Sequence, residues 1–168
     1  TLEEIATRAA SEAMTAIGNG ALYAERYLED ARHVEIQIIG DGTGAVSHLW
    51  DRDCSLQRRH QKLIEIAPSP NLSETVRAAL CDAAVKMAEA VQYRGIGTFE
   101  FLVDAKTDSF FFIEANARLQ VEHTVTEAVL GLDLVKAQLA VAHGQTLADT
   151  GLDLANVPPP KGTAVQAR

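Results

Sequence analysis

Three features that define common protein classes are absent from this 168-residue sequence. No apolar run approaches the roughly 20 residues that a membrane-spanning helix needs, so we expect no membrane partner. The opening stretch, TLEEIATRAASEAM, lacks the basic start and the apolar run of a signal peptide. Neither of the glycine-rich patterns GxxxxGK[ST] and GxGxxG occurs. Any bound nucleotide is therefore not held by a P-loop or a Rossmann turn.

Cysteine is scarce, and acidic residues outnumber basic ones. Cys54 and Cys81 form neither a metal-binding spacing nor a disulfide framework, and Cys81 falls in a helical pattern typical of a small buried thiol. From this cysteine usage and the absence of a signal peptide we expect a reducing compartment and a cytoplasmic location. The 15 Lys and Arg face 23 Asp and Glu, and the net charge of −8 argues against general nucleic-acid binding.

What is present is the composition of a folded domain. Hydrophobic residues make up 47% of the chain and the mean hydropathy is −0.01, which suits one domain, or one and a fraction. The sequence does not begin with Met and opens inside a helical pattern, so we expect a piece of a longer chain.

Apolar periodicity predicts an α+β chain. Helices are expected over 2–17, 74–91, 126–131 and 134–142, with Ser73 and Asp133 as N-caps. Strands are expected over 21–28, 33–39, 45–50, 63–66, 98–103, 110–113 and 162–168. The strict alternation of 33–39 predicts a half-buried strand. Residues 51–61 hold too few apolar residues for a core element, which favours a loop that is either solvated or binds an anion.

Gly97–His123 is the stretch with the clearest chemistry. Two runs of strand-forming residues, joined by a polar turn, each carry one carboxylate, Glu100 in the first and Glu114 at the end of the second. In a hairpin both can project from one face, together with Asn116. Carboxylates that lie close together raise each other's pKa, and a divalent cation such as Mg²⁺ removes that penalty. A hairpin with a solvated polar face is the alternative.

The end of this stretch adds Arg118, Gln120, Glu122 and His123. They supply a forked anion binder, an amide and a candidate general base close to the expected metal. The combination favours a site over a solvated surface.

Three long segments resemble the ATP-grasp core of biotin carboxylase, from about Glu25 to the end: RHVEIQIIGDGTGAVSHLWDRDCSLQRRHQKLIEIAPSP, GTFEFLVD and IEANARLQVEHTVTEAVLGLDLVKAQL. The resemblance implies a truncated ATP-grasp fold, an antiparallel sheet flanked by helices. Residues 1–143 would be the C-terminal part of the nucleotide-binding domain. Residues 144–168 would be a linker and the start of the C-terminal subdomain. The N-terminal subdomain and most of the ATP lid would precede Thr1, so the chain is expected to be inactive alone.

The resemblance also implies a reaction and its partners. Bicarbonate attacks the γ-phosphate of ATP, with Mg²⁺ or Mn²⁺ as the metal, and the carboxyphosphate formed yields CO₂, which N1′ of biotin captures. Biotin would arrive on a carrier domain, and a carboxyltransferase would complete an acyl-CoA carboxylase, with a homodimer as one assembly. The segment 147–161, longer than in bacterial single-function relatives, and Gln166 point to a large multidomain enzyme.

Roles are carried over by matching positions. The residues implied in nucleotide binding are Glu25, Arg26 and Leu28 at the adenine, His33, Gln57 and His60 at the ribose and phosphates, and Glu100 and Glu114 through the metal, with Asn116 nearby. The residues implied in bicarbonate binding are Lys62, Arg118, Gln120 and the Val121 backbone. Glu122 would be the base and Arg168 would stabilise the biotin enolate, so the catalytic set is Glu122, Arg118, Lys62 and Arg168.

Departures from the family pattern are confined to residues with no implied ligand role. Ala115, Ala117 and Thr124 stand where relatives commonly carry Met, Thr and Pro. Two alternatives stay open. One is another ATP-grasp ligase such as a carbamoyl-phosphate synthase, in which Arg168 would have no role. The other is a non-catalytic anion-binding or nucleic-acid-binding module built on Arg52, Arg58, Arg59 and Lys62.

Overall fold

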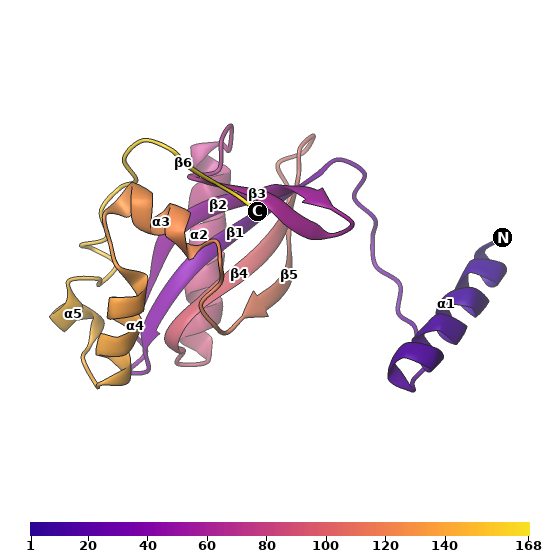
Figure 1. Ribbon diagram of the computed structural model, residues 1–168, viewed down its shortest axis with the longest axis horizontal. Coiled ribbons are helices and arrows are strands. Elements are labelled where there is room, and N and C mark those ends of the chain that lie inside the picture. Colours follow the sequence, from indigo (N-terminus) through magenta and orange to yellow (C-terminus); the bar gives the residue numbers. More distant parts are fainter.

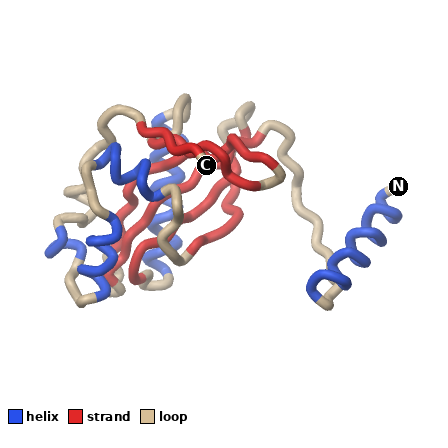
Figure 2. The backbone as a smooth tube through the Cα atoms, in the orientation of Figure 1, coloured by secondary structure: helices blue, strands red, loops and turns tan.

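The computed structural model describes residues 1–168, and one antiparallel sheet of six strands forms its centre (Figure 1). The strands are β1 (Ala31–Asp41), β2 (Val46–Arg58), β3 (Gln61–Ala67), β4 (Arg94–Asp104), β5 (Phe110–Asn116) and β6 (Ala164–Ala167). Their order across the sheet is β5-β4-β1-β2-β3-β6. The sheet with its flanking helices confirms the predicted fold class (Figure 2).

Five helices accompany this sheet, and all but the first pack on its two faces. They are α1 (Leu2–Ile17), α2 (Glu74–Ala90), α3 (His123–Leu130), α4 (Leu134–Ala142) and α5 (Leu147–Thr150). One hydrophobic core joins α2 to β1 and β4, and a second joins α3, α4 and α5 to the sheet. Ser73 and Asp133 cap α2 and α4 as predicted, whereas α3 starts earlier than expected and α5 lies in the segment expected to be a linker. None of the helices combines the length and apolar content that crossing a bilayer would require.

The alternation of β1 divides its side chains between two buried environments. Val34, Ile36 and Ile38 belong to the core under α2. Glu35 and Gln37 alternate with them and are also completely buried, so the prediction of a half-buried strand was wrong. The polar face of β1 is covered by ion pairs and amides of the chain itself, and this face carries the candidate site described below.

Two expectations about local structure were also wrong. Residues 51–61 are not a loop, because β2 runs through to Arg58 and the stretch Asp51–Cys54 is buried. Charged residues can occupy this core strand because they are paired within the protein. Residues 21–28 form no strand, because no neighbouring strand hydrogen-bonds to them.

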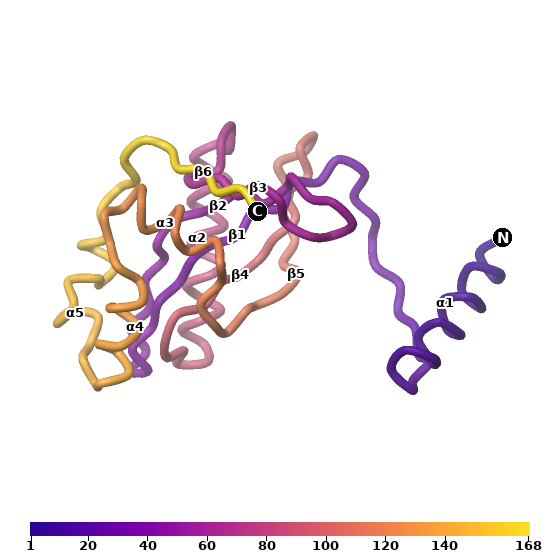
Figure 3. Tube along the Cα trace, in the orientation of Figure 1, coloured from indigo at the N-terminus to yellow at the C-terminus, as the bar shows by residue number.

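The two ends of the chain lie in different surroundings. Helix α1 stands apart from the sheet at the end of an extended connection, and none of its residues is buried (Figure 3). At the other end β6 pairs antiparallel with β3, as Ile64 lies opposite Ala167. The strand predicted at 162–168 is thereby confirmed, and it brings Arg168 to the edge of β3. The division of the chain at residue 143 stays a prediction.

Candidate functional site

A polar cavity of about 640 Å³ lies at the face of the sheet that carries Glu100. Its lining comprises His33, Gln57, His60, Gln61, Lys62, Leu63, Glu100, Glu114, Asn116, Arg118, Gln120, Val121, Glu122 and Arg168. Of these 14 residues, only Gln61 and Leu63 were not predicted as site residues. The fold thus brings together the predicted side chains from β1 to the end of the chain. They come from β1 to β5, the turn between β2 and β3, the segment before α3, and Arg168 after β6.

Lys62 is the centre of the ionic contacts in the polar cavity. Its Nζ donates hydrogen bonds to Glu35 Oε2 at 2.7 Å, Glu122 Oε1 at 2.9 Å and Glu100 Oε1 at 3.0 Å. Burial alone would lower the pKa of Lys62, but the negative charge of Glu35 and the hydrogen bonds outweigh burial and raise it. Lys62 is therefore a permanent cation, and it binds carboxylates from β1, β4 and the segment before α3.

Arg52 supports this arrangement from inside the sheet. It is completely buried, and its Nε donates to Glu35 Oε1 at 2.5 Å. Its remaining donors reach Gln37, Thr98 and Thr126. The planar guanidinium group, with its fixed set of N–H donors, suits a site enclosed by several buried acceptors. Arg52 therefore belongs to the support of the site, and its assignment to an exposed nucleic-acid-binding surface was wrong.

Besides Gln61 and Leu63, sequence reasoning missed Glu35, and it named Arg52 only for an exposed surface, although both residues support the site from inside the sheet. The available signal was the position of Glu35 and Gln37 in a strand whose other face is entirely apolar. That pattern was attributed to solvent exposure, because alternation alone does not distinguish water from a buried ionic network. A buried charge has to be paired, and the partner comes from the next strand.

Glu100 accepts more hydrogen bonds than any other carboxylate of the cavity. Besides Lys62, its donors include Gln120 Nε2 at 3.0 Å and His33 Nε2 at 2.5 Å. Gln57 donates to Nδ1 of the same imidazole at 2.7 Å, which places the proton of the ring on Nε2, facing Glu100. Burial opposes ionisation of Glu100, but these donors and Lys62 lower its pKa to about 2. Glu100 is thus an anion at neutral pH.

The hairpin predicted from the sequence is present, with its acidic residues in register. Glu100 lies directly opposite Glu114, and Asn116 Nδ2 donates to both carboxylates at 2.9 Å. Oxygen ligands of this kind are those that Mg²⁺ prefers, so the chemistry of the donor set fits the predicted metal. Glu35 and His33 also have ligand atoms within 4.8 Å of an oxygen of Glu100.

Glu122 and Arg168 close the cavity on the side of β3. Arg168 Nη2 donates to Glu122 Oε2 at 2.7 Å, while the other oxygen of Glu122 accepts from Lys62. Burial would raise the pKa of Glu122, but the hydrogen bond from Lys62 lowers it below its usual range. The carboxylate is thereby kept ionised between two cations. His123 begins α3 next to it, and its Nδ1 bonds to the Gln120 carbonyl, so this side chain fixes the loop.

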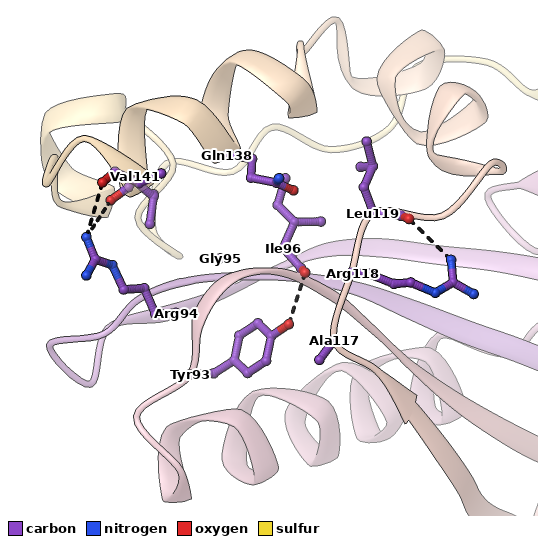
Figure 4. Close-up of a pocket in the computed structure, with 10 residues that line it drawn as sticks. Tyr93, Arg94, Gly95, Ile96, Ala117, Arg118, Leu119, Gln138 and Val141 are labelled. Atoms are coloured by element: carbon purple, nitrogen blue, oxygen red, sulfur yellow. Dashed lines mark hydrogen bonds between the residues drawn. The ribbon is translucent and has the colours of Figure 1, made fainter.

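Arg118 lies between the polar cavity and a second cavity of about 540 Å³ beside α4 (Figure 4). Its Nη1 donates to the carbonyl oxygen of Leu119 at 3.3 Å. In the second cavity, Tyr93 Oη donates to the Ile96 carbonyl at 3.0 Å and Arg94 Nη2 to the Val141 carbonyl at 3.1 Å. Arg118 makes no ion pair with the carboxylates of the cavity, which leaves its charge available to an anion in the cavity.

The predicted adenine residues are not brought to the polar cavity. Glu25 and Arg26 are exposed and Leu28 is half-buried, and all three lie on the extended connection after α1. The guanidinium of Arg26 stacks over the ring of Phe111 on β5, 5.9 Å from its centre. The connection therefore passes the outer edge of the sheet, and the adenine role stays a prediction.

Comparison with known proteins gives consistent matches. The sequence model of the family "Carbamoyl-phosphate synthase L chain, ATP binding domain" matches residues 1–150. Mitochondrial pyruvate carboxylase of Rattus norvegicus is 52% identical over 99% of this chain, which spans 14% of that enzyme's length.

Solved structures agree in fold and sequence. A biotin carboxylase–β-γ-ATP complex from Campylobacter jejuni has a TM-score of 0.87 and 47% identity, covering 99% of this chain and 36% of that one. The biotin carboxylase domain of the Hydrogenobacter thermophilus 2-oxoglutarate carboxylase, a dimer in complex with MgADP and bicarbonate, has a TM-score of 0.88 and 41% identity, with coverage of 99% and 36%.

Proposed function

The chain belongs to the family of the carbamoyl-phosphate synthase L chain, ATP-binding domain, and we propose that it forms part of the biotin carboxylase site of a larger biotin-dependent carboxylase. The observation that carries the proposal is the convergence of Lys62, Glu122 and Arg168 beside Glu100. Relatives named as pyruvate carboxylase and biotin carboxylase, with sequence identities of 52% and 47%, support the proposal.

In the proposed reaction the bicarbonate anion is held by the cations of the polar cavity. Lys62 and Arg118 would neutralise its charge, with Gln120 and the Val121 backbone as further contacts. Glu122 is ionised and takes the proton of bicarbonate while a bicarbonate oxygen bonds to the γ-phosphorus and ADP leaves. The carboxyphosphate then separates into CO₂ and phosphate. The phosphate takes the proton of biotin N1′, and N1′ bonds to the carbon of CO₂. Arg168 would stabilise the biotin enolate.

Glu100, Glu114 and Asn116 would hold Mg²⁺ or Mn²⁺. When bound, the metal would offset the negative charge of the nucleotide phosphates and orient them. The residues of this chain contribute alignment and charge, which is most of what phosphoryl transfer requires from a protein. His33, Gln57 and His60 line the same cavity and are proposed to contact the ribose and phosphates.

For the final acceptor, the sequence analysis favoured an acyl-CoA. The relatives named above act on pyruvate and 2-oxoglutarate according to their names, which favours a 2-oxo acid. We propose pyruvate as the first substrate to test, with acyl-CoA thioesters as the alternative. Within the family, a carbamoyl-phosphate synthase is disfavoured because Arg168 makes an ion pair inside the cavity.

Several expectations stay predictions within this proposal. They are the cytoplasmic location, the assembly as a homodimer, the carrier and carboxyltransferase partners, and the inactivity of the chain alone. Each concerns either parts of the enzyme beyond this chain or its surroundings in the cell.

The proposal is tested in the carboxylase that carries this chain. We expect release of phosphate from ATP to depend on both bicarbonate and Mg²⁺, with carboxylation of free biotin. Glu122→Gln, which removes the base but keeps the shape, should lower carboxylation about 10²- to 10⁴-fold. Glu89→Gln, at an exposed position of α2, should leave the rate unchanged. A parent enzyme that carboxylates no biotin would contradict the proposal.

A further inference from the structure

Glu65 is a buried carboxylate for which the mechanism above has no use. It lies on β3, opposite Gln166 of β6, and its exposed fraction is 0%. It does not line the polar cavity. An ionised carboxylate is expensive to bury without partners, so its presence in the sheet requires an explanation.

Arg168 is the one cation within ion-pairing distance of Glu65. The Nε atom of Arg168 lies 2.7 Å from Oε1 of Glu65, and no group of the chain donates a well-aligned hydrogen bond to either carboxylate oxygen. The contact is therefore an ion pair without good hydrogen-bond geometry. Burial raises the pKa of Glu65, and the charge of Arg168 acts in the opposite direction. Without Arg168, Glu65 would be a buried carboxylate with no ion-pair partner, and only the more distant charge of Lys62 would favour its anionic form.

Arg168 is consequently held by two carboxylates on different parts of its guanidinium. Its Nε faces Glu65, and its Nη2 donates to Glu122. Its backbone N–H donates to the Leu63 carbonyl at 2.9 Å. Two carboxylates on one planar fork define the orientation of that plane more closely than one would.

The two carboxylates differ in what the reaction does to them. In the proposed function Glu122 takes a proton from bicarbonate, and its attraction for Arg168 then weakens. Glu65 does not line the cavity, so it is not the group that takes this proton. The negative charge of Glu122 raises the pKa of Glu65, so protonation of Glu122 favours the anionic form of Glu65 and its ion pair with Arg168. The contact with Glu65 is the one that persists when Arg168 is needed for the biotin step.

We propose that Glu65 is a positioning residue that keeps the guanidinium of Arg168 at the polar cavity while Glu122 is protonated. This inference rests on the proposed function for its catalytic consequence, although the contact itself does not. A role confined to joining β3 and β6 is disfavoured, because four backbone pairs and the hydrogen bond from Thr124 to Gln166 already join β6 to its surroundings.

The first test is a double-mutant cycle in the carboxylase that carries this chain. The variants are Glu65→Gln, Arg168→Gln and the double variant, with Glu89→Gln on α2 as the control. Glu65→Gln should lower the kcat for biotin carboxylation about 10- to 100-fold, with the KM for ATP unchanged. The double variant should be no slower than Arg168→Gln, and Glu65→Asp should restore part of the rate. Additive losses, or an unchanged kcat, would overturn the inference.

The second test needs no activity. In the 168-residue chain, NMR would follow the exchange of the Arg168 Nε–H with water, the signal being identified by its loss in Arg168→Lys. Glu65→Gln should accelerate this exchange about 10-fold or more, and Glu89→Gln should not. Should Glu65→Gln fail to fold, Glu65→Asp serves in the same measurement, with a smaller acceleration expected. Equal exchange in parent and variant overturns the inference. If the parent carboxylates no biotin, the proposed function fails while this measurement still decides the role of Glu65.

Discussion

At the scale of single residues, the buried ion pairs carry both stability and function. Arg52 is enclosed by acceptors on β1, β4 and α3, and Glu35 depends on it for charge compensation. Without Arg52, Lys62 alone would have to balance the negative charges of the carboxylates around it. Buried pairs of this type contribute little net stability, but breaking one leaves an uncompensated charge.

We therefore predict a large effect of Arg52→Ala on folding. Removal of the guanidinium should lower the free energy of unfolding by about 3–5 kcal/mol, because Glu35 stays buried without its main partner. Arg8→Ala is the matched control, since its pair with Glu12 lies on the exposed side of α1 and should change the free energy by less than about 0.5 kcal/mol. Urea unfolding of the three proteins measures both values, and similar small losses in the two variants would contradict the prediction.

The pKa of Glu100 leads to a second prediction about acid stability in metal-free protein. Its folded pKa of about 2 lies below the ordinary value of 4.5. The stabilisation is therefore fully present above pH 4.5 and is lost as the pH falls toward 2. Over this range the parent should lose on the order of 3 kcal/mol more than Glu100→Gln does. Denaturant unfolding at a series of pH values measures the difference, and parallel curves would refute it.

The predictability of the site differed between its residues for a physical reason. Glu100, Glu114 and Asn116 could be placed on one face because strand geometry fixes the direction of alternate side chains. Glu35 could not, because its burial depends on Arg52 from another strand. Arg168 was identified through the family resemblance alone, since its contact with Glu122 depends on the pairing of β6 with β3.

At the scale of elements, local signals identified most helices and strands. The capping residues Ser73 and Asp133 marked helix starts that the structure confirms. The second half of β2 was missed because its charges are neutralised by tertiary contacts that no local pattern reports. The connection 21–28 was predicted as a strand because it contains strand-forming residues. It is not one, because no partner strand pairs with it.

Helix α1 leads to a prediction at this scale. It contributes no buried residue, and its apolar side chains are largely exposed, as for Leu2 at 83% and Ile17 at 77%. Deletion of residues 1–17 should therefore change the free energy of unfolding of the sheet domain by less than about 1 kcal/mol. Thermal and urea unfolding of the shortened chain measure this. A loss above about 2 kcal/mol would show that α1 stabilises the sheet.

At the scale of the whole molecule, the hydrophobic cores and the candidate site occupy different areas of the sheet. One face and half of the other hold two hydrophobic cores, and the remaining polar half holds the cavity. Residues far apart in sequence meet there because β1 and β2 lie in the middle of the strand order. We propose that this polar half binds a metal–nucleotide complex through the facing carboxylates of β4 and β5.

The most direct test is calorimetry of ADP binding, with and without Mg²⁺, in the carboxylase proposed above to contain this chain. The parent should bind ADP more tightly when Mg²⁺ is present. The double variant Glu100→Gln, Glu114→Gln should lose this metal-dependent gain, which we expect to be about 10-fold or more. Glu89→Gln should behave as the parent. A double variant that keeps the full metal-dependent affinity would contradict the account.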